Sequence, residues 1–559
     1  MKNTKGTIEN ERPSGLRRGW LHLLVILLIA GLSVLVVFPW RILPADAAAD
    51  QFSGGRAMEH LAVIASEPHP QNSPAQEHVR DYLKEQLSGL GYEVEIQRSH
   101  GVENVVARLP GTDPTGSIVI LAHYDSPSNS PGAGDNGSGV AVLLEVMDAL
   151  SERPAPRNTI IALFDDGEEL PDEFSGSKAF VRESPWMENV QVAISLDSAV
   201  AGPISINETG PGNAWLMPAL ARSYNGGAWT SMSGGGNYDC TPFRNAGVQV
   251  IALESNYPFW QKHTPKDTLD IVRPASVQQM GDQTLAIARE LGDLDLTNLG
   301  GNQETFFQVF GLGFIHYPET WTLPFVIAAA VLFVGILVAA LRSRQVTLRG
   351  LAVALGSILA TTAISAVGVG ALWPRLPDLL GWETNRWPEW PEVIPPHGGW
   401  VDLIFALLIL VLAIVGYRLA RRWSKPMDFS IAGLLPFLLA ATATAFAAPR
   451  GSYLFTWPVL ISLLGWIAAW VIGKKRTNRS LDLVLLVTAS AFIIFILPFL
   501  PGVVMADGMK SLAILAGVEA LILGVVLPAV DSLLVRRTAN VDLYPLHTET
   551  RKSQRTQNI

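Results

Sequence analysis

Two hydrophobic patterns divide the 559-residue chain. Between residues 50 and 300, short apolar runs with alternating or helical periodicity are separated by polar turns, which is typical of a globular domain. From residue 320 to 535, and once near the amino terminus, the apolar runs are about twenty residues long, as a helix that crosses a bilayer requires. The pattern therefore predicts one water-exposed domain joined to a membrane-embedded region.

The first long apolar run covers residues 20–40 and has tryptophan at both ends. Basic residues precede it and an acidic segment follows it, which places residues 1–19 in the cytoplasm and residue 50 onward outside. A cleaved signal peptide is the alternative, because residues 45–47 read Ala-Asp-Ala, a small-residue cleavage pattern. The run exceeds the roughly 7–15 residues of a signal-peptide core, so we predict a transmembrane anchor at residues 20–41.

The segment 50–300 alternates between helical and strand-like patterns, which predicts a mixed, largely parallel sheet flanked by helices on both faces. The expected helices are 56–66, 73–90, 140–150 and 274–291. The expected strands are 92–97, 104–109, 117–121, 158–165, 190–197 and 248–253.

Seven further candidate spans form the predicted membrane domain at residues 321–534. They are 321–341, 351–372, 400–420, 430–448, 453–472, 481–500 and 511–534. Lys and Arg collect in alternate connections, so we expect both termini in the cytoplasm, with residues 535–559 as a polar tail and the globular domain outside.

Two features of this region remain open from the sequence. The outer loop 373–400 carries five tryptophans, at 373, 382, 387, 390 and 400, and either lies along the membrane surface beneath the globular domain or forms a simple aromatic belt. Glu519 falls inside the last span, where an ionisable residue marks a transport pathway or an interhelical contact.

Composition excludes some classes of protein. The formal net charge of -9 leaves no basic patch of the kind that nucleic-acid binding requires. The single cysteine, Cys240, excludes an intrachain disulfide. A catalytic thiol would need a histidine partner, so we expect Cys240 to be a buried structural residue.

Chemically active side chains recur where the predicted strands end. His123 and Asp125 follow the strand 117–121, and Asp135 lies in the glycine-rich turn that comes next. Glu168 and Glu169 follow the strand 158–165, and Asp197 ends the strand 190–197. The loop after the last strand carries His263. Imidazole and carboxylate groups gathered at one sheet edge are typical of a divalent-metal site.

The motifs containing these residues occur in a recognisable order: HYDS with PGAGDNGSG, DDGEE, SLDS, YDCTPF and HTPKDT. Residues 56–292 thereby resemble the co-catalytic di-zinc exopeptidases, the bacterial leucyl aminopeptidase and glutamate carboxypeptidase group. The whole layout is similar to the membrane-anchored branch of that family, the endoplasmic-reticulum metallopeptidases and fungal vacuolar membrane proteases.

The resemblance implies a zinc-dependent exopeptidase, most closely an aminopeptidase that hydrolyses peptides with a water positioned by two zinc ions. It makes His123 and Asp197 ligands of one zinc and Glu169 and His263 ligands of the other, with Asp135 bridging both. Glu168 takes the position of the general base. Asp125 is expected to orient the imidazole of His123, because a ligating histidine needs a partner on its other nitrogen.

This chain departs from the family pattern in two places. Lys262 stands where members often carry tyrosine, with Tyr257 and Trp260 nearby, so carbonyl polarisation is not predictable. The insert LPDEF after Glu169 leaves the first substrate pocket unpredicted.

Three other functions compete with the peptidase. A glutaminyl-cyclase-like acyltransferase would use one zinc on a similar fold, a receptor or scaffold would have no activity, and a transporter would use the domain as an accessory. The five retained ligand positions and Glu168 favour the peptidase.

Overall fold

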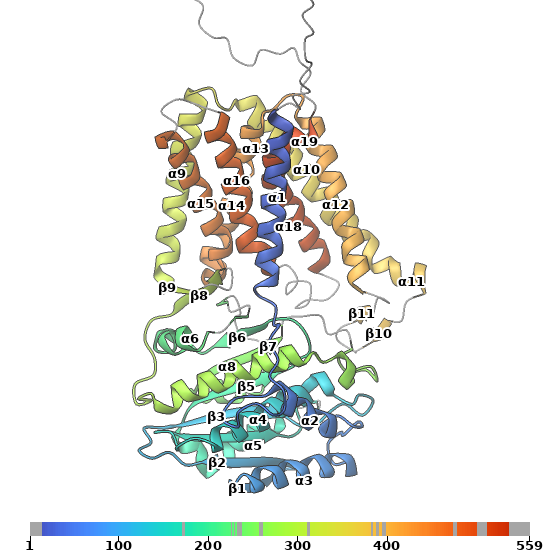
Figure 1. Ribbon diagram of the computed structural model, residues 1–559, viewed down its shortest axis with the longest axis vertical. Coiled ribbons are helices and arrows are strands. Elements are labelled where there is room, and N and C mark those ends of the chain that lie inside the picture. The colour runs from blue at the N-terminus through green and yellow to red at the C-terminus, as the bar shows by residue number, and fades with distance from the viewer. Residues whose placement is uncertain are drawn as a thin grey trace, which may run out of the picture.

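The computed structural model describes residues 14–169, 174–224, 226–227, 230–231, 237–255, 261–309, 313–381, 384–386, 391–393, 398–472, 478–499 and 511–535. An α/β domain lies at one end of the molecule and a bundle of long helices at the other (Figure 1). The α/β fold, the long apolar amino-terminal helix and the helical carboxyl-terminal region are all as predicted.

The α/β domain is built on a seven-stranded sheet with the strand order β1-β2-β4-β3-β5-β7-β6. Its strands are β1 (Glu93–Ser99), β2 (Val102–Leu109), β3 (Ser117–His123), β4 (Thr159–Asp165), β5 (Val190–Asp197), β6 (Ile204–Thr209) and β7 (Gln249–Ser255). The central strands β4, β3, β5 and β7 run parallel, whereas β1, β2 and β6 are antiparallel to their neighbours. The sheet is therefore mixed, and its parallel part is confined to the centre.

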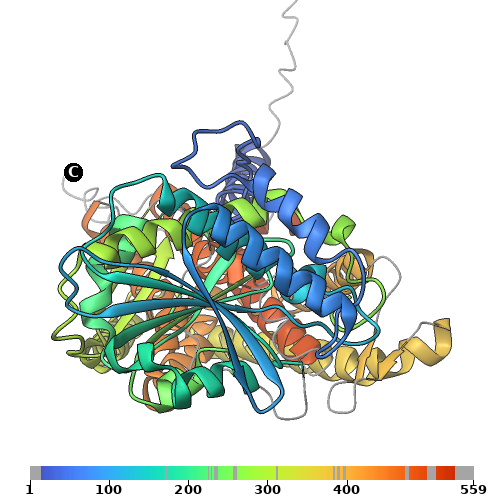
Figure 2. The same cartoon turned by 90° about the horizontal axis from the view of Figure 1, so that it is seen from below.

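Helices cover both faces of this sheet (Figure 2). One core contains residues of α2 (Gly54–Ile64), α3 (Pro74–Gly89), α4 (Ser138–Ser151), α6 (Met217–Ser223) and α8 (Pro274–Asp293). The other contains residues of α5 (Ser175–Glu183) and α7 (Thr241–Asn245). Strand alternation sends Ile118 and Ile120 of β3 into the first core and Val119 and Leu121 into the second. Burial on both faces explains the continuous apolar run that predicted this strand.

A hairpin that the sequence did not predict joins the domain to the bundle. It consists of β8 (Glu304–Val309) and β9 (Gly313–Pro318). Phe306 packs into the α/β core, whereas the next residue, Phe307, packs into the core of the bundle and stacks on Tyr453 with ring centroids 4.2 Å apart. The Tyr453 hydroxyl also lies 2.6 Å from the Thr230 hydroxyl of the α/β domain. Alternation along one strand thus connects two hydrophobic cores.

Within the described residues, seven helical segments are long and apolar enough to cross a membrane. They are Leu16–Leu35, Glu319–Arg342, Leu348–Leu380, Leu403–Ala420, Pro426–Ala447, Tyr453–Val471 and Leu512–Leu534. The remaining predicted span, 481–500, corresponds to α16 (Asn478–Ile496), whose described apolar section, Asp482–Ile496, is shorter. The predicted span 430–448 is two helices, α13 (Pro426–Ala432) and α14 (Leu434–Ala447).

The first helix, α1 (Ser14–Leu35), runs along the outside of the bundle from its far end toward the α/β domain (Figure 1). Near its start, Arg18 pairs with Asp482 at 3.0 Å, and Nδ1 of His22 lies 2.8 Å from the carbonyl of Ala529. The chain therefore enters the bundle and reaches α19 (Asp531–Leu534) at the same end, opposite the α/β domain.

The tryptophan-rich loop is described only in part. Trp373 is buried and packs against Phe405 inside the bundle, not along a surface. The predictions for Trp382, Trp387 and Trp390 lie outside the described residues.

Candidate metal centre

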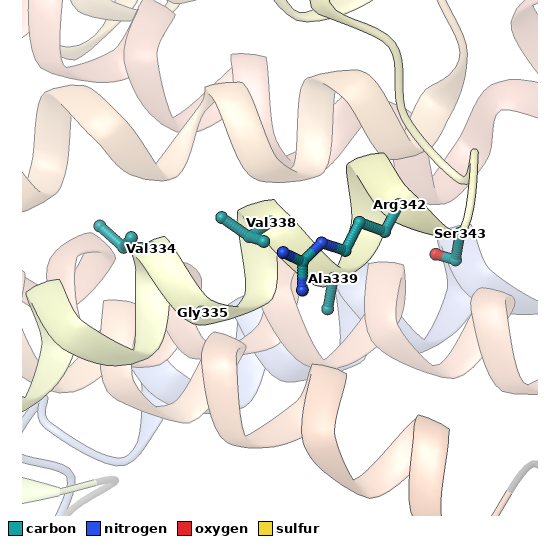
Figure 3. Close-up of a pocket in the computed structure, with 6 residues that line it drawn as sticks. All are labelled: Val334, Gly335, Val338, Ala339, Arg342 and Ser343. Atoms are coloured by element: carbon teal, nitrogen blue, oxygen red, sulfur yellow. The ribbon is translucent and has the colours of Figure 1, made fainter.

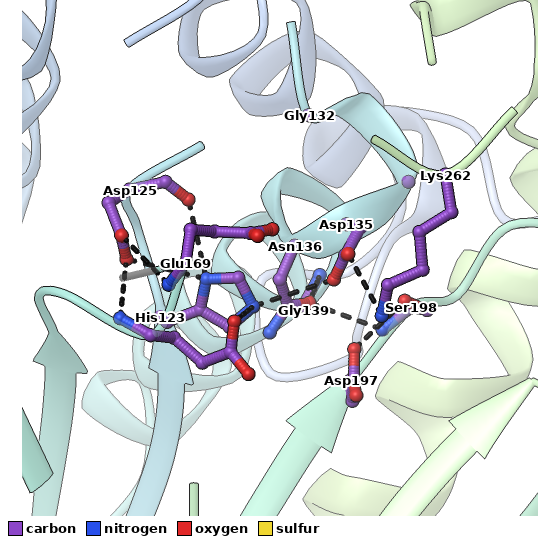
Figure 4. Close-up of polar contacts among 12 residues, drawn as sticks. His123, Asp125, Gly132, Asp135, Asn136, Gly139, Glu169, Asp197, Ser198 and Lys262 are labelled. Atoms are coloured by element: carbon purple, nitrogen blue, oxygen red, sulfur yellow. Dashed lines mark hydrogen bonds and ion pairs between the residues drawn. The ribbon is translucent and has the colours of Figure 1, made fainter. Parts of the chain in front are cut away.

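The parallel strands bring the predicted site residues to one edge of the sheet (Figure 4). His123 is the last residue of β3 and Asp197 the last of β5, and these strands are direct neighbours. Glu168 and Glu169 follow β4, which pairs with β3 on its other side. Because parallel strands end at a common edge, residues more than 70 positions apart in sequence meet there.

Two groups of potential ligands share one residue. His123, Asp135 and Asp197 form one group, and Asp135, Glu169 and His263 form the other, with the ligand atoms of each group within 4.8 Å of one another. Nε2 of His123 lies 3.5 Å from Oδ1 of Asp135, and Nε2 of His263 lies 2.9 Å from Oδ2. All five predicted ligands therefore meet in one cluster, in the pairing that the resemblance implied.

The residues present fit a pair of divalent metal ions. Asp135 is only 1% exposed, and its carboxylate oxygens face ring nitrogens of His123 and His263 and the ammonium of Lys262. A buried carboxylate is unfavourable unless cations or hydrogen-bond donors compensate it, and a metal ion held between Asp135 and each histidine would add such compensation. Imidazole and carboxylate donors are the set that zinc accepts in proteins.

Asp125 connects the histidine to the glutamate pair. Its Oδ1 lies 3.5 Å from Nδ1 of His123 on the side away from Asp135, which is the place expected for an orienting carboxylate. The same carboxylate accepts hydrogen bonds from the backbone N–H groups of Glu168 and Glu169, both at 3.2 Å. This second set of contacts was not predicted, and it places the two glutamates relative to His123.

The adjacent glutamates lie differently. Oε2 of Glu169 lies 3.1 Å from Nε2 of His263, and this side chain is only 4% exposed. Oε2 of Glu168 lies 3.9 Å from Nε2 of His123, and its side chain is 25% exposed. Burial, together with the neighbouring Glu169 and Asp135 carboxylates, raises the pKa of Glu168 to about 8. Because its side chain is more exposed than that of Glu169, Glu168 faces the accessible side of the cluster. A third potential ligand group, His123 with Glu168 and Glu169, includes it as well.

Lys262, noted in the sequence as a departure from the family pattern, reaches into this centre. Its Nζ lies 2.9 Å from Oδ2 of Asp135, the oxygen that also contacts His263. Although burial opposes it, Asp135 and then Asp197 raise the pKa of Lys262 well above its ordinary value, so the side chain is a cation. Tyr257, Trp260 and residues 170–173 of the insert lie outside the described residues.

Sequence reasoning missed one further acidic residue at the same edge. Glu254 lies on β7 directly opposite Asp197 of β5. Its Oε2 accepts hydrogen bonds from the amide of Asn207 and, at 3.4 Å, from the hydroxyl of Tyr238. Its place directly after the predicted strand 248–253 is the sequence signal that could have identified Glu254. Cys240 is buried, as expected, and burial raises the pKa of its thiol well above the ordinary value.

A groove in the membrane region shares no residue with the metal centre. It has a volume of about 690 Å³ and lies on α9 (Thr322–Arg342), lined by Val334, Gly335, Val338, Ala339, Arg342 and Ser343 (Figure 3). Its lining is apolar apart from Arg342 and Ser343, so it offers no catalytic group.

The fold and the site together define an α/β domain with a candidate metal centre at the carboxyl ends of its parallel strands. Residues 104–288 match the model of Peptidase family M28, and the chain therefore carries a domain of this metallopeptidase family.

Two named proteases are similar to part of the chain. Endoplasmic reticulum metallopeptidase 1 of Mus musculus is 30% identical over 244 residues, which cover 39% of this chain and 26% of the relative. Vacuolar membrane protease of Candida albicans is 29% identical over 238 residues, which cover 39% of this chain and 28% of the relative. The match thus spans little more than a quarter of each relative.

Solved structures also align with part of the chain. A zinc aminopeptidase from Bacillus subtilis aligns with a TM-score of 0.39 and 16% identity, covering 43% of this chain and 95% of that one. A glutaminyl cyclase from Porphyromonas gingivalis aligns with a TM-score of 0.37 and 20% identity, covering 43% of this chain and 99% of that one.

A metal ion held by Asp135 would compete with Lys262 for this carboxylate, because two cations placed a few ångströms apart repel each other. Lys262→Met should therefore tighten the binding of Zn²⁺ by about tenfold or more, measured by competition with a chelator. Lys266→Met, an exposed lysine in the same loop, is the matched control and should leave the affinity unchanged. Unchanged or weaker binding in Lys262→Met would contradict this competition.

Proposed function

We propose that the protein is a membrane-anchored, zinc-dependent aminopeptidase with two zinc ions per chain. The observation that carries the proposal is the pair of three-residue groups sharing Asp135, with Glu168 beside them on the accessible side. His123 and Asp197 hold one ion, Glu169 and His263 hold the other, and Asp135 contacts both. Each ion has three protein ligands, which leaves room for water and substrate.

The zinc pair supplies a lowered water pKa and a positive charge for the scissile carbonyl oxygen. The chain supplies the proton transfers. Glu168 accepts the proton of the attacking water and returns it to the departing amine, a role for which its partly exposed position beside the ligand cluster suits it. Asp125 keeps the backbone of Glu168 and the ring of His123 in fixed relation during these transfers.

Two complete ligand groups favour this function over an acyltransferase that uses a single zinc. The surplus of carboxylates at the sheet edge also favours substrates with a free amino terminus. Glu254, which is outside the ligand set, lies beside Asp197 there, and negative charge attracts an ammonium group.

The proposed topology places the α/β domain outside the cytoplasm and both termini inside. It is supported by the meeting of α1 and α19 at the end of the bundle opposite the domain, and by the basic connections of the sequence.

Mutation should distinguish the role of Glu168 from that of Glu169. Glu168→Gln keeps the shape but loses the base, so turnover should fall by about 10²–10⁴-fold while both zinc ions stay bound. Glu169→Gln should instead weaken one zinc ion and lower the thermal unfolding midpoint measured in zinc, because metal that binds the folded state stabilises it. Zinc content, turnover and unfolding of the two variants provide the measurement. The opposite pattern would exchange the two roles.

Substrate ends provide the next test. Short peptides with free amino termini should be hydrolysed from that end, and amino-acetylation should abolish turnover because the ammonium no longer orients the scissile carbonyl. Carboxyl-amidated peptides are the matched control and should be cleaved at the same rate as free ones. Cleavage of both peptides is measured by mass spectrometry. Equal cleavage of acetylated and free peptides would reject the aminopeptidase proposal.

Topology can be tested by protease protection. Protease added to right-side-out vesicles should cut within the α/β domain and leave an epitope at the carboxyl terminus intact. Detergent-opened vesicles serve as the control in which both are cut. Loss of the epitope in sealed vesicles would overturn the proposed orientation.

A further inference from the structure

Asp135, the residue common to both ligand groups, lies on a glycine-rich loop before α4. Glycine-rich backbone does not hold a side chain by its own stiffness, because glycine allows many conformations. Two buried polar side chains outside the ligand set join this loop to its surroundings, one from the His263 loop and one from the glycine-rich loop itself.

The first is Asp267, which follows His263 by four residues and is completely buried. Its carboxylate accepts hydrogen bonds from the backbone N–H of Gly134 at 2.6 Å and of Asp135 at 3.2 Å. Its backbone carbonyl accepts a third from the N–H of Ala133 at 3.2 Å. Three consecutive residues that end at Asp135 are thus fixed to the loop of His263.

The His263 loop is itself closed by local hydrogen bonds, so Asp267 and His263 move together. The N–H of Asp267 donates to the carbonyl of Thr264 at 3.1 Å, and the hydroxyl of Thr264 donates to the carbonyl of Gln261 at 2.7 Å. Asp267 therefore sets the distance between Asp135 and His263, the two ligands of one group.

The second side chain is Asn136, which acts on the other group. Its amide nitrogen donates to the carbonyl of Leu196 at 2.8 Å, and its amide oxygen accepts from the N–H of Ser198 at 3.2 Å. These two backbone groups flank Asp197. Asn136 therefore sets the distance between Asp135 and Asp197.

We infer that Asp267 and Asn136 are positioning residues that hold Asp135 between the two metal positions, each serving a different one. Asp267 serves the position of Glu169 and His263, and Asn136 serves the position of His123 and Asp197. The inference rests on the proposed function, because it assigns these residues to the metal pair of that site.

The zinc affinity of each metal position can be measured without any substrate. In the full-length chain in detergent, chelator competition should resolve two zinc affinities. Asp267→Asn replaces an accepting oxygen with an N–H group that faces another N–H, and it should weaken one affinity about 10–100-fold, as loss of a partner outside the ligand set does. Asn136→Asp, which removes the donor to Leu196, should weaken the other.

Combination with a ligand mutation identifies the position. In a His263→Gln background, which has lost one zinc position, Asp267→Asn should change the remaining affinity by less than about threefold, since both changes act on the same position. Asn136→Asp should still weaken it about 10–100-fold in that background.

A matched control distinguishes a loss of positioning from general structural damage. Asp270→Asn alters an exposed aspartate of the same loop and should leave both affinities unchanged. The unfolding midpoint in chelator, where metal contributes nothing, should fall no further in Asp267→Asn than in Asp267→Glu, which retains the charge.

Wild-type affinities in Asp267→Asn and Asn136→Asp would overturn this inference while leaving the proposed function intact. An equal loss at both positions in either variant would also overturn it. A wild-type chain that binds no zinc would instead refute the proposed function.

Discussion

The site depends on the buried carboxylate of Asp135, which carries negative charge where almost no water reaches it. Such a group is stable only when cations or hydrogen-bond donors compensate it, and here the contacts come from His123, His263 and Lys262. His123 contacts one oxygen of this carboxylate, whereas the adjacent residues Lys262 and His263 contact the other. Because one carboxylate must satisfy all of them, the position of its backbone determines the geometry of both ligand groups.

The sheet makes this convergence possible. Four parallel central strands, buried on both faces, end at one edge, and the loops that follow them carry the ligands. The rigid elements therefore position His123 and Asp197 directly, whereas Asp135, Glu169 and His263 depend on hydrogen bonds between loops. Loop ligands need such cross-links because a loop without them would spread over many conformations.

Among the described residues, aromatic packing and hydrogen bonds join the helical bundle to this domain. Phe306 and Phe307 lie in two different cores, and Tyr453 adds a stacked ring and a hydroxyl contact. Two buried aromatic residues on a short hairpin resist rotation of one core relative to the other, because turning either part would expose apolar surface to water. The α/β domain consequently has a defined orientation with respect to the bundle.

Much of this molecule was determined by local sequence. Periodicity was sufficient for the main helices and for six of the seven strands, since buried parallel strands are apolar throughout and long apolar runs need a bilayer. Motif order, through the family resemblance, predicted the five candidate ligands and Glu168, which the structure brings into one cluster. The remainder depended on contacts between distant segments, which no local pattern contains. The strand β6 and the β8–β9 hairpin were missed because their residues owe their burial to partners elsewhere in the chain. The reach of Lys262 to Asp135, the position of Glu254 beside Asp197, and the hydrogen bonds of Asp267 became visible only in the tertiary structure, because a side chain's electrostatic environment is set by the groups folded around it.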